Sequence, residues 1–188
     1  MGKMESKSEI RKKVLALRDR LGPMERKRSE ILMTERILGH QWYYKAKELL
    51  IFLSYGSEID TAPIWEEALR QGKKVYVPCV LGEYMEFFRI SGKADLQPGY
   101  KGIPEPVDID KREKFVFTVE KTDSALMLMP GVAFDPVRNR IGYGKGFYDR
   151  YLADKMGLHT IAIGYDCQMV SAIEAEENDI RPMQVICL

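Results

Sequence analysis

The sequence predicts an α/β fold in a single domain, with a mainly parallel central sheet flanked by helices. Apolar runs of strand length alternate with segments that repeat apolar residues at helical spacing, the order typical of parallel sheets covered by helices. The chain has 188 residues, of which 45% are hydrophobic and 30% are charged, a composition typical of globular domains with a substantial core. We therefore expect residues 1–188 to form one domain.

Two helices are predicted before the first strand. The apolar stripe of the first helix recurs at helical spacing and consists of Ile10, Val14, Leu17 and Leu21. This stripe leaves Arg11 and Arg18 to other faces, and Gly22-Pro23 ends the helix. A second helix is predicted from about Met24 to Leu38, and its expected buried residues are Ile31, Leu32 and Leu38.

The first strand is predicted at residues 49–53, an unbroken apolar run of the kind found in strands buried on both faces. A third helix follows, capped by Asp60 or Thr61, with Pro63 in its first turn and Gly72 after its end. Its expected buried stripe contains Ile64, Trp65, Ala68 and Leu69.

The remaining strands are predicted at residues 74–80, 85–90, 125–129, 160–164 and 184–188. Tyr148, Leu152 and Met156 indicate a last helix, ended by Gly157. Residues 92–114 are rich in glycine, proline and charge and are expected to form a long surface connection. Ligands of such sheets gather where parallel strands end, and we expect both Glu58 and the glycine-rich residues 142–146 just past such ends.

Charge and cysteine usage narrow the classes of partner. The 29 Lys and Arg nearly balance the 28 Asp and Glu, so nucleic acid and membrane surfaces are not expected partners. No apolar run approaches the roughly 20 residues that span a bilayer, and Cys79, Cys167 and Cys187 form no Cys-X-X-Cys pair. These features predict a cytoplasmic protein with reduced thiols. His40 and His159 have no companions at metal or triad spacing and are expected to be structural.

Three glycines at alternate positions surround one lysine near residue 145. Gly142, Gly144 and Gly146 can turn their amides toward an anion, and Arg140 and Lys145 add positive charge. The spacing fits neither the P-loop nor the dinucleotide fingerprint, and a plain glycine-rich turn between a strand and a helix is the alternative. Asp149, four residues after Lys145 at a helix start, adds a ligand suited to magnesium, which favours nucleotide binding.

Residues 129–152 resemble the signature of the 5-formyltetrahydrofolate cyclo-ligase family. The resemblance rests on Pro-Gly-Val-Ala-Phe-Asp followed by Arg-Ile-Gly-Tyr-Gly-Lys-Gly-Phe-Tyr-Asp, although Phe147 stands where the family usually has tyrosine. Thinner matches follow in the same order at Lys7-Ser8-Glu9-Ile10-Arg11, residues 54–61, residues 102–106 and Glu177-Asn178-Asp179. The resemblance implies a NagB/RpiA/CoA transferase-like fold. It also implies ATP- and magnesium-dependent conversion of 5-formyltetrahydrofolate to 5,10-methenyltetrahydrofolate through a phosphorylated formyl oxygen. We expect a monomer, although the sequence itself does not give the oligomeric state.

The resemblance also implies the site residues. ATP would contact Lys7, Arg11, Arg140, Ile141, Gly142, Tyr143, Gly144, Lys145, Gly146, Phe147 and Tyr148. The folate would contact Leu53, Glu58, Tyr143, Gly144, Lys145, Gly146 and Phe147. Mg²⁺ would be held by Asp149 and Asp179, and Lys145 and Arg140 would be the catalytic cations.

Each of these assignments has an ordinary alternative. Lys7 and Arg11 could instead belong to a solvated basic face, or Lys13 could contact ATP in a shifted register. Glu58 could be a helix-capping or surface acid. Asp179 lies in the acidic run 174–179, which would ordinarily be a solvated face. Tyr148 and Tyr151 suit the core of a helix. Two other functions stay open, namely a non-catalytic nucleotide or folate sensor, toward which Phe147 is the one hint, and a small-molecule kinase with the same cradle.

Overall fold

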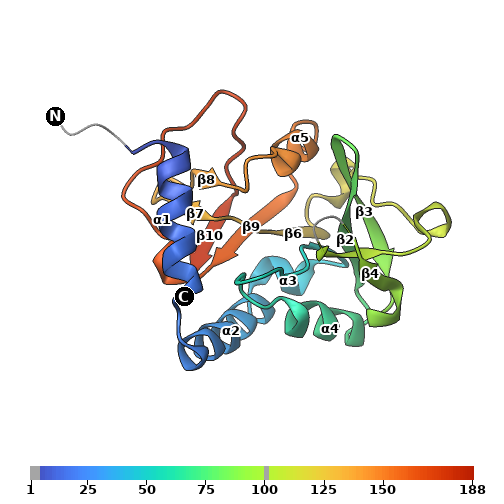
Figure 1. Ribbon diagram of the computed structural model, residues 1–188. Helices are drawn as coiled ribbons and strands as arrows, with labels where there is room; N and C mark the ends of the chain where they lie inside the picture. Colours follow the sequence, from blue (N-terminus) through green and yellow to red (C-terminus); the bar gives the residue numbers. More distant parts are fainter. Residues whose placement is uncertain (1–4, 100–101) are drawn as a thin grey trace.

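Six strands form one sheet in the computed structural model of the chain, which describes residues 5–99 and 102–188. They are β1 (Glu48–Ile51), β2 (Lys74–Leu81), β3 (Tyr84–Ile90), β6 (Ala125–Met129), β9 (His159–Gly164) and β10 (Gln184–Cys187). The order across the sheet is β10-β9-β6-β1-β2-β3, and every neighbouring pair is parallel except β2 and β3. The predicted, mainly parallel sheet is confirmed, with β3 as an antiparallel edge strand (Figure 1).

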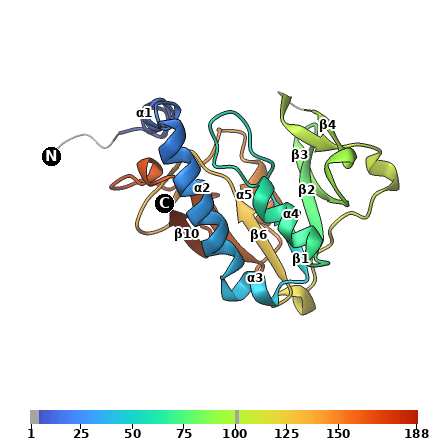
Figure 2. The ribbon, with the colours of Figure 1, turned by 90° about the horizontal axis from the view of Figure 1, so that it is seen from below.

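Helices cover both faces of this sheet. α2 (Pro23–Leu38), α3 (Gln41–Lys45) and α4 (Ala62–Arg70) pack on one face, along the lower side of the sheet in Figure 1. The short helix α5 (Phe147–Leu152) packs on the other face. Figure 2, seen from below, shows α2 and α4 lying over the sheet, with their axes running roughly along β6.

Alternating side chains of the central strands feed two apolar cores. Leu49 of β1 lies beside Leu126 of β6, and both point to the core under α2 and α4. Leu50 lies beside Met127, and both point to the opposite core under α5. An unbroken apolar run is stable as a strand only between two such layers, which is why residues 49–53 predicted a strand here; the strand itself begins one residue earlier, at Glu48, and ends at Ile51.

Helix α1 (Lys7–Asp19) packs on a separate two-stranded antiparallel sheet, called here the ribbon, rather than on the main sheet. Ile10 and Val14 contact a third apolar cluster around β7 (Ala133–Phe134) and β8 (Arg140–Ile141). A capping box begins the helix, since Ser6 Oγ accepts from the Glu9 amide and the Glu9 carboxylate accepts from the Ser6 amide. Because β8 leads into the glycine-rich residues, this docking places α1 beside them.

The expected faces of α1 need one correction. Leu17 was expected inside and is 43% exposed, whereas Arg18 was expected outside and is 3% exposed. The guanidinium of Arg18 finds polar partners there, donating to Ser57 Oγ at 3.0 Å and to the Tyr143 hydroxyl at 2.9 Å. Arg18, and not Leu17, is therefore buried at this end of α1, because the neighbouring loops offer hydrogen-bond acceptors.

Two other helices differ from their predictions. In α2 the buried residues are Met33 and Ile37, while Ile31 and Leu32 are 48% and 42% exposed, because a single stripe of this helix faces the sheet. The last helix ends at Leu152 instead of reaching Met156, which is 88% exposed. Lys155 Nζ donates to the Tyr151 carbonyl at 2.8 Å and so satisfies an end carbonyl of the shortened helix.

The connections hold more structure than the sequence indicated. The predicted surface connection contains the hairpin β4 (Leu96–Pro98) and β5 (Pro104–Pro106), and residues 100–101 within that prediction lie outside the described residues. Short 3₁₀ helices lie at Lys93–Asp95, Ile109–Lys111, Val119–Lys121 and Asp166–Gln168. Of the two predicted caps of α4, Thr61 occupies the N-cap position but its side chain makes no capping hydrogen bond, whereas the Asp60 carboxylate accepts from the Ala62 amide at 2.9 Å. Within the described ranges no helix is long and apolar enough to cross a membrane.

Candidate active site around the glycine loop

Residues 142–146, called here the glycine loop, join β8 to α5. Gly144 and Gly146 adopt left-handed conformations with φ of +90° and +64°, which side chains with a Cβ rarely adopt. Gly146 is also the N-cap of α5. The loop follows the ribbon strand β8 and not a strand of the main sheet, which corrects the predicted placement. The ribbon nevertheless places the glycine loop beside α1, where Arg11 contacts it.

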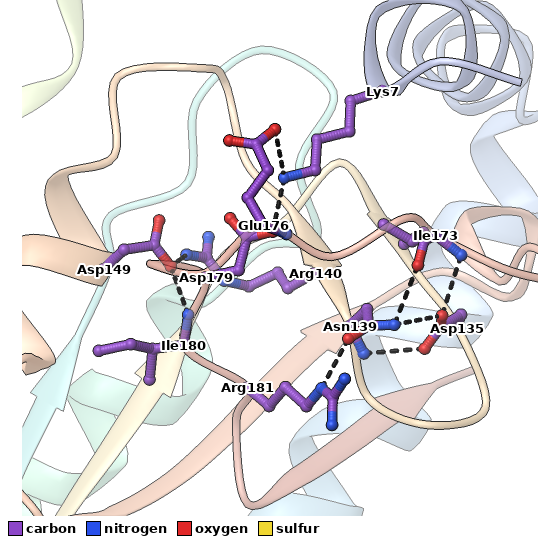
Figure 3. A network of polar contacts seen from close by, with 10 residues as sticks. All are labelled: Lys7, Asp135, Asn139, Arg140, Asp149, Ile173, Glu176, Asp179, Ile180 and Arg181. Carbon is purple, nitrogen blue, oxygen red and sulfur yellow. Dashed lines mark hydrogen bonds and ion pairs between the residues drawn. The ribbon is translucent and has the colours of Figure 1, made fainter.

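Arg140 and Asp149 form an ion pair across this loop. Arg140 Nη2 lies 3.0 Å from Asp149 Oδ1, which also accepts from the Ile180 amide at 3.1 Å (Figure 3). Arg140 is 8% exposed, and its guanidinium lies 5.6 Å from the centre of the Tyr148 ring. Its Nε atom has no hydrogen-bond partner among the described residues. A buried cation that is only partly satisfied suits an anion-binding position.

Lys7 and Asp179 form a second ion pair, between the two ends of the chain. Lys7 Nζ lies 2.5 Å from Asp179 Oδ2 and 2.9 Å from Glu176 Oε1 (Figure 3). Burial works to lower the pKa of Lys7, but the hydrogen bonds and charges of Asp179 and Glu176 outweigh it and raise the pKa. Burial likewise opposes ionisation of Asp179, yet the Glu176 amide and Lys7 hold the pKa of Asp179 below its ordinary value. Both groups are therefore charged at neutral pH.

Arg11 ties α1 to the glycine loop. Its Nε atom donates to the Gly142 carbonyl at 2.9 Å, and a Cβ built at Gly144 would lie 3.6 Å from Arg11 Nη2. Lys13 instead pairs with Glu5 at 3.3 Å, where both side chains are more than half exposed. The contacts therefore favour the register of Lys7 and Arg11 over the alternative with Lys13.

Glu58 and Tyr143 meet at the opposite side of the loop. Tyr143 donates its hydroxyl proton to Glu58 Oε1 at 2.9 Å, and Glu58 Oε2 accepts from the Tyr55 amide at 2.9 Å. Burial is the main cause of the raised pKa of Glu58, opposed by these two hydrogen bonds and by the charge of Arg18. Glu58 thus accepts a hydrogen bond within its own turn, rather than capping a helix, and also contacts the glycine loop.

Lys145 lies on the exposed side of the loop. It lines an open pocket of about 450 Å³ together with Phe147, Arg150 and the tip of the β2–β3 hairpin at residues 82–84. Among the residues that the structure describes, Lys145 forms no ion pair, so its ammonium is available to a ligand in this pocket. Phe147 packs against the core under α5 and lies 5.3 Å from the Arg150 guanidinium.

The remaining predicted residues are internal. Leu53 is 5% exposed and Ile141 is 1% exposed, so both shape the site from within the cores. Tyr148 is half-buried and Tyr151 is buried, and burial raises the pKa of both phenols, as the core interpretation expects.

Three residues beside the site were not predicted. Arg18 reaches Tyr143, Glu176 reaches Lys7, and Arg150 lines the pocket beside Lys145. For Arg18 a signal existed, because positions 7, 11 and 18 share one helical face. Glu176 lies in an acidic run, and nothing in its spacing distinguishes it from its neighbours.

The described acidic residues of the site offer oxygen ligands but no preformed cluster. Within the described ranges no group of three or more His, Cys, Asp or Glu side chains is placed to hold a metal. Asp149 uses only Oδ1 and Asp179 only Oδ2 in the contacts above, so each has a second oxygen free. Two carboxylates match a magnesium ion bound mainly through phosphates and water.

Comparison with known proteins identifies the family. A sequence model of the 5-formyltetrahydrofolate cyclo-ligase family matches residues 3–188. The 5-formyltetrahydrofolate cyclo-ligase of Escherichia coli (strain K12) is 36% identical over 141 residues, covering 72% of this chain and 74% of that protein. The mouse 5-formyltetrahydrofolate cyclo-ligase is 29% identical over 176 residues, covering 88% of this chain and 85% of that protein.

Solved structures agree. The Aquifex aeolicus 5,10-methenyltetrahydrofolate synthetase superimposes with a TM-score of 0.81 at 31% identity, covering 95% of this chain and 88% of that chain. The Mycoplasma pneumoniae 5,10-methenyltetrahydrofolate synthetase, at 19% identity and a TM-score of 0.76, shares the fold. The resemblance of residues 129–152 is thus confirmed along nearly the whole length. The chain belongs to the 5-formyltetrahydrofolate cyclo-ligase family, whose members are ligases.

Proposed function

We propose that this chain converts 5-formyltetrahydrofolate to 5,10-methenyltetrahydrofolate, using ATP and magnesium and releasing ADP and phosphate. One observation carries the proposal: cations from separate parts of the chain converge on a glycine loop with two left-handed glycines. Lys7 and Arg11 come from α1 and Arg140 from β8, so the loop combines backbone amides with fixed positive charge. Such an arrangement binds phosphate groups.

ATP lies along residues 140–148, with Lys7 and Arg11 reaching it from α1. The ion pairs of the site suggest how ATP binds. ATP phosphates replace Asp149 at Arg140 and Asp179 at Lys7, which exchanges one set of charge pairs for another. The exchange leaves the cations paired throughout, so none is buried without a counter-charge.

Magnesium is held by Asp149 and Asp179 together with the phosphates. Their free oxygens are hard ligands of the type that this ion prefers. When bound, the magnesium ion would neutralise part of the negative charge of the phosphates. The charge of Mg²⁺ would compensate the carboxylates of Asp149 and Asp179 after phosphates take their places at Arg140 and Lys7.

The reaction proceeds through phosphorylation of the formyl oxygen. That oxygen attacks the γ-phosphorus of ATP, the bond from this phosphorus to the β,γ-bridging oxygen breaks, and ADP leaves. The carbon then accepts N10 of the same molecule, N10 releases its proton to water, and phosphate departs with the electrons of the carbon–oxygen bond. Phosphorylation is needed because a formamide oxygen is a poor leaving group.

Lys145 and Arg140 act on the transferring phosphoryl group. They stabilise charge that develops on its oxygens, while the loop holds the two reactants in line. The folate lies beside Leu53, Glu58 and residues 143–147, between the loop that follows β1 (residues 52–61) and the open pocket. Phe147 keeps an aromatic ring at this wall, so the missing hydroxyl leaves the apolar contact intact.

The proposal is tested with purified protein, Mg-ATP and 5-formyltetrahydrofolate. We expect the near-ultraviolet absorbance of the methenyl product to appear in equal amount with ADP, and both to stop when magnesium is chelated. Binding of both ligands without turnover would instead indicate a sensor. ADP formation without folate, but with another acceptor, would indicate a kinase.

We propose further that residues 1–188 act as one cyclo-ligase domain and as a cytoplasmic monomer. The match over residues 3–188 supports the single domain. Light scattering during turnover checks the oligomeric state.

A further inference from the structure

The turn between β2 and β3, residues 82–84 and called here the hairpin tip, is exposed to solvent. Tyr84 is 68% exposed, whereas the next residue, Met85, is 6% exposed and packs in the core under α5. Gly82 makes the turn with a φ of +65°, which glycine adopts without strain. Apolar burial therefore does not fix the hairpin tip, and an exposed turn of this kind moves unless other contacts hold it.

Arg150 of α5 lines the same open pocket as the hairpin tip and reaches it. Its Nη2 atom donates to the Glu83 carbonyl at 2.9 Å. Among the residues that the structure describes, this is the one hydrogen bond by which a group outside the hairpin contacts residues 82–84. Figure 1 shows the end of the hairpin beside α5.

The same guanidinium lies over the end of the glycine loop. Its centre is 5.3 Å from the centre of the Phe147 ring, and a Cβ built at Gly146 would lie 3.0 Å from Arg150 Nη1. A planar guanidinium can stack on an aromatic ring while it donates hydrogen bonds in its own plane. Arg150 thus joins the glycine loop to the hairpin tip, and both line the pocket of about 450 Å³ beside Lys145.

We propose that Arg150 is a positioning residue that holds the hairpin tip as a fixed wall of the pocket toward which the folate extends. The inference rests on the proposed function, in which the folate lies between the loop that follows β1 and this pocket, while Lys7 and Arg11 reach ATP from α1. A wall that is already in place need not be ordered when the ligand binds, which favours binding. Arg150 touches no reacting atom in this scheme, so it acts on folate binding and not on the chemical step.

An ordinary surface role explains less. A cation in the last turn of a helix is favoured by the helix dipole, and Arg150 occupies such a position in α5. That role requires no contact beyond α5, and it leaves unexplained why the side chain donates to the backbone of the hairpin. Loss of a dipole contact would change stability alone, whereas loss of a positioning residue changes the Michaelis constant.

Steady-state kinetics with Mg-ATP and 5-formyltetrahydrofolate test the inference. In Arg150→Met we expect KM for the folate to rise about fivefold, as for one lost hydrogen bond, with kcat and KM for ATP within about twofold of wild type. Arg150→Lys keeps a donor and should recover most of the loss. Arg28→Met, at an exposed position of α2, is the control and should match wild type.

Backbone mobility gives a second readout that requires no turnover. ¹⁵N relaxation should give the hairpin tip order parameters of about 0.85 in wild type and below about 0.6 in Arg150→Met. Low values in wild type would overturn the inference, and this measurement stands even if Arg150→Met does not fold. An unchanged KM for the folate in folded Arg150→Met would also overturn it, whether or not the tip becomes mobile.

The inference and the proposed function can fail separately. If no methenyl product forms, calorimetric titration with 5-formyltetrahydrofolate replaces the measurement of KM. An affinity weakened about fivefold in Arg150→Met, with the control unchanged, would then support the inference and refute the proposed function alone. Turnover with a folate affinity that does not depend on Arg150 would refute the inference alone.

Discussion

At the scale of single residues, the acids proposed to hold magnesium are paired with the cations proposed to hold phosphate. Asp149 contacts Arg140, and Asp179 contacts Lys7, each with one oxygen. Arg140 and Lys7 therefore each have a counter-charge before a ligand binds. Binding of Mg-ATP redistributes these pairs rather than adding unpaired charge to a buried place, which keeps the desolvation cost low.

Asp149→Asn tests the magnesium assignment. Losing one charged ligand should raise the magnesium concentration for half-maximal rate by about tenfold or more, because hydrogen bonds and contacts to charged groups are worth roughly 1.5–3 kcal/mol. Steady-state rates over a magnesium titration give this value. Asp154→Asn, at an exposed acid beyond α5, is the control and should behave like wild type. An unchanged requirement in Asp149→Asn removes Asp149 from the ligand set.

Lys145→Ala tests the catalytic cation. Loss of one preorganised donor to the transferring group typically lowers kcat by about 10²- to 10³-fold. Thermal unfolding should be nearly unchanged, because Lys145 is exposed and forms no ion pair with the described residues. Lys12→Ala, at an exposed position of α1, controls for loss of a surface lysine. A folded Lys145→Ala variant with nearly full activity would contradict the assignment.

At the scale of elements, one buried carboxylate joins the ribbon to the segment that carries Asp179. Asp135 accepts hydrogen bonds from the Asn139 amide and side chain at 2.8 Å each and from the Ile173 amide at 3.0 Å (Figure 3). Asn139 Oδ1 in turn accepts from Arg181 Nε at 2.6 Å. The ribbon thereby holds residues 173–181, and with them Asp179, at a fixed place beside Arg140.

Asp135→Ala should therefore destabilise the protein and loosen this segment. Several buried donors lose their acceptor, so we expect the free energy of unfolding to fall by about 2–4 kcal/mol. Urea unfolding followed by circular dichroism measures it, with Asp110→Ala at an exposed position as the control. Amide exchange at residues 173–181 should rise in the variant. A loss no larger than that of the control would mean that apolar contacts alone hold the segment.

Glu113, beside the edge strands β2 and β3, makes a contribution to stability that depends on pH. Hydrogen bonds from Lys74 and Tyr76 are the main causes that lower its pKa to about 2, and Arg89 adds a third. A carboxyl whose pKa is lowered in the folded state stabilises the protein above its ordinary value of about 4.5, and this contribution is lost as pH falls toward 2.

Glu113→Gln should therefore lower the free energy of unfolding at neutral pH by less than about 1 kcal/mol, since the pairs are partly exposed. Urea titrations from pH 7 downward should show the difference from wild type vanishing in the acid range. Glu35→Gln, exposed on α2, is the control. A difference that stays constant down to the lowest pH would show that lost packing, not charge, is responsible.

At the scale of the whole molecule, the site combines parts that are distant in sequence. The Arg11–Gly142 bond spans 131 positions and the Lys7–Asp179 bond spans 172. Local periodicity predicted the strands, because alternation and apolar runs reflect immediate burial. It could not predict these pairs, which depend on where α1 docks. Only the family resemblance brought Lys7, Arg11 and Asp179 into one site.

The errors have a common physical origin. Periodicity assigns apolar residues to the interior and charges to the surface, as most sequences require. Arg18 breaks this rule because polar loops cover the end of α1, and Leu17 is exposed as a result. Ile31 and Leu32 break it because α2 has more apolar residues than its single buried stripe can hold.

Transfer of a phosphoryl group to the formyl oxygen can be followed with an isotope label. 5-Formyltetrahydrofolate carrying ¹⁸O in the formyl group is converted with Mg-ATP in ordinary water, and the released phosphate is examined by mass spectrometry. The account predicts one ¹⁸O atom in each phosphate formed. Methenyl product accompanied by unlabelled phosphate would mean that ATP is hydrolysed by water and that the formyl oxygen leaves by another route, which contradicts the account.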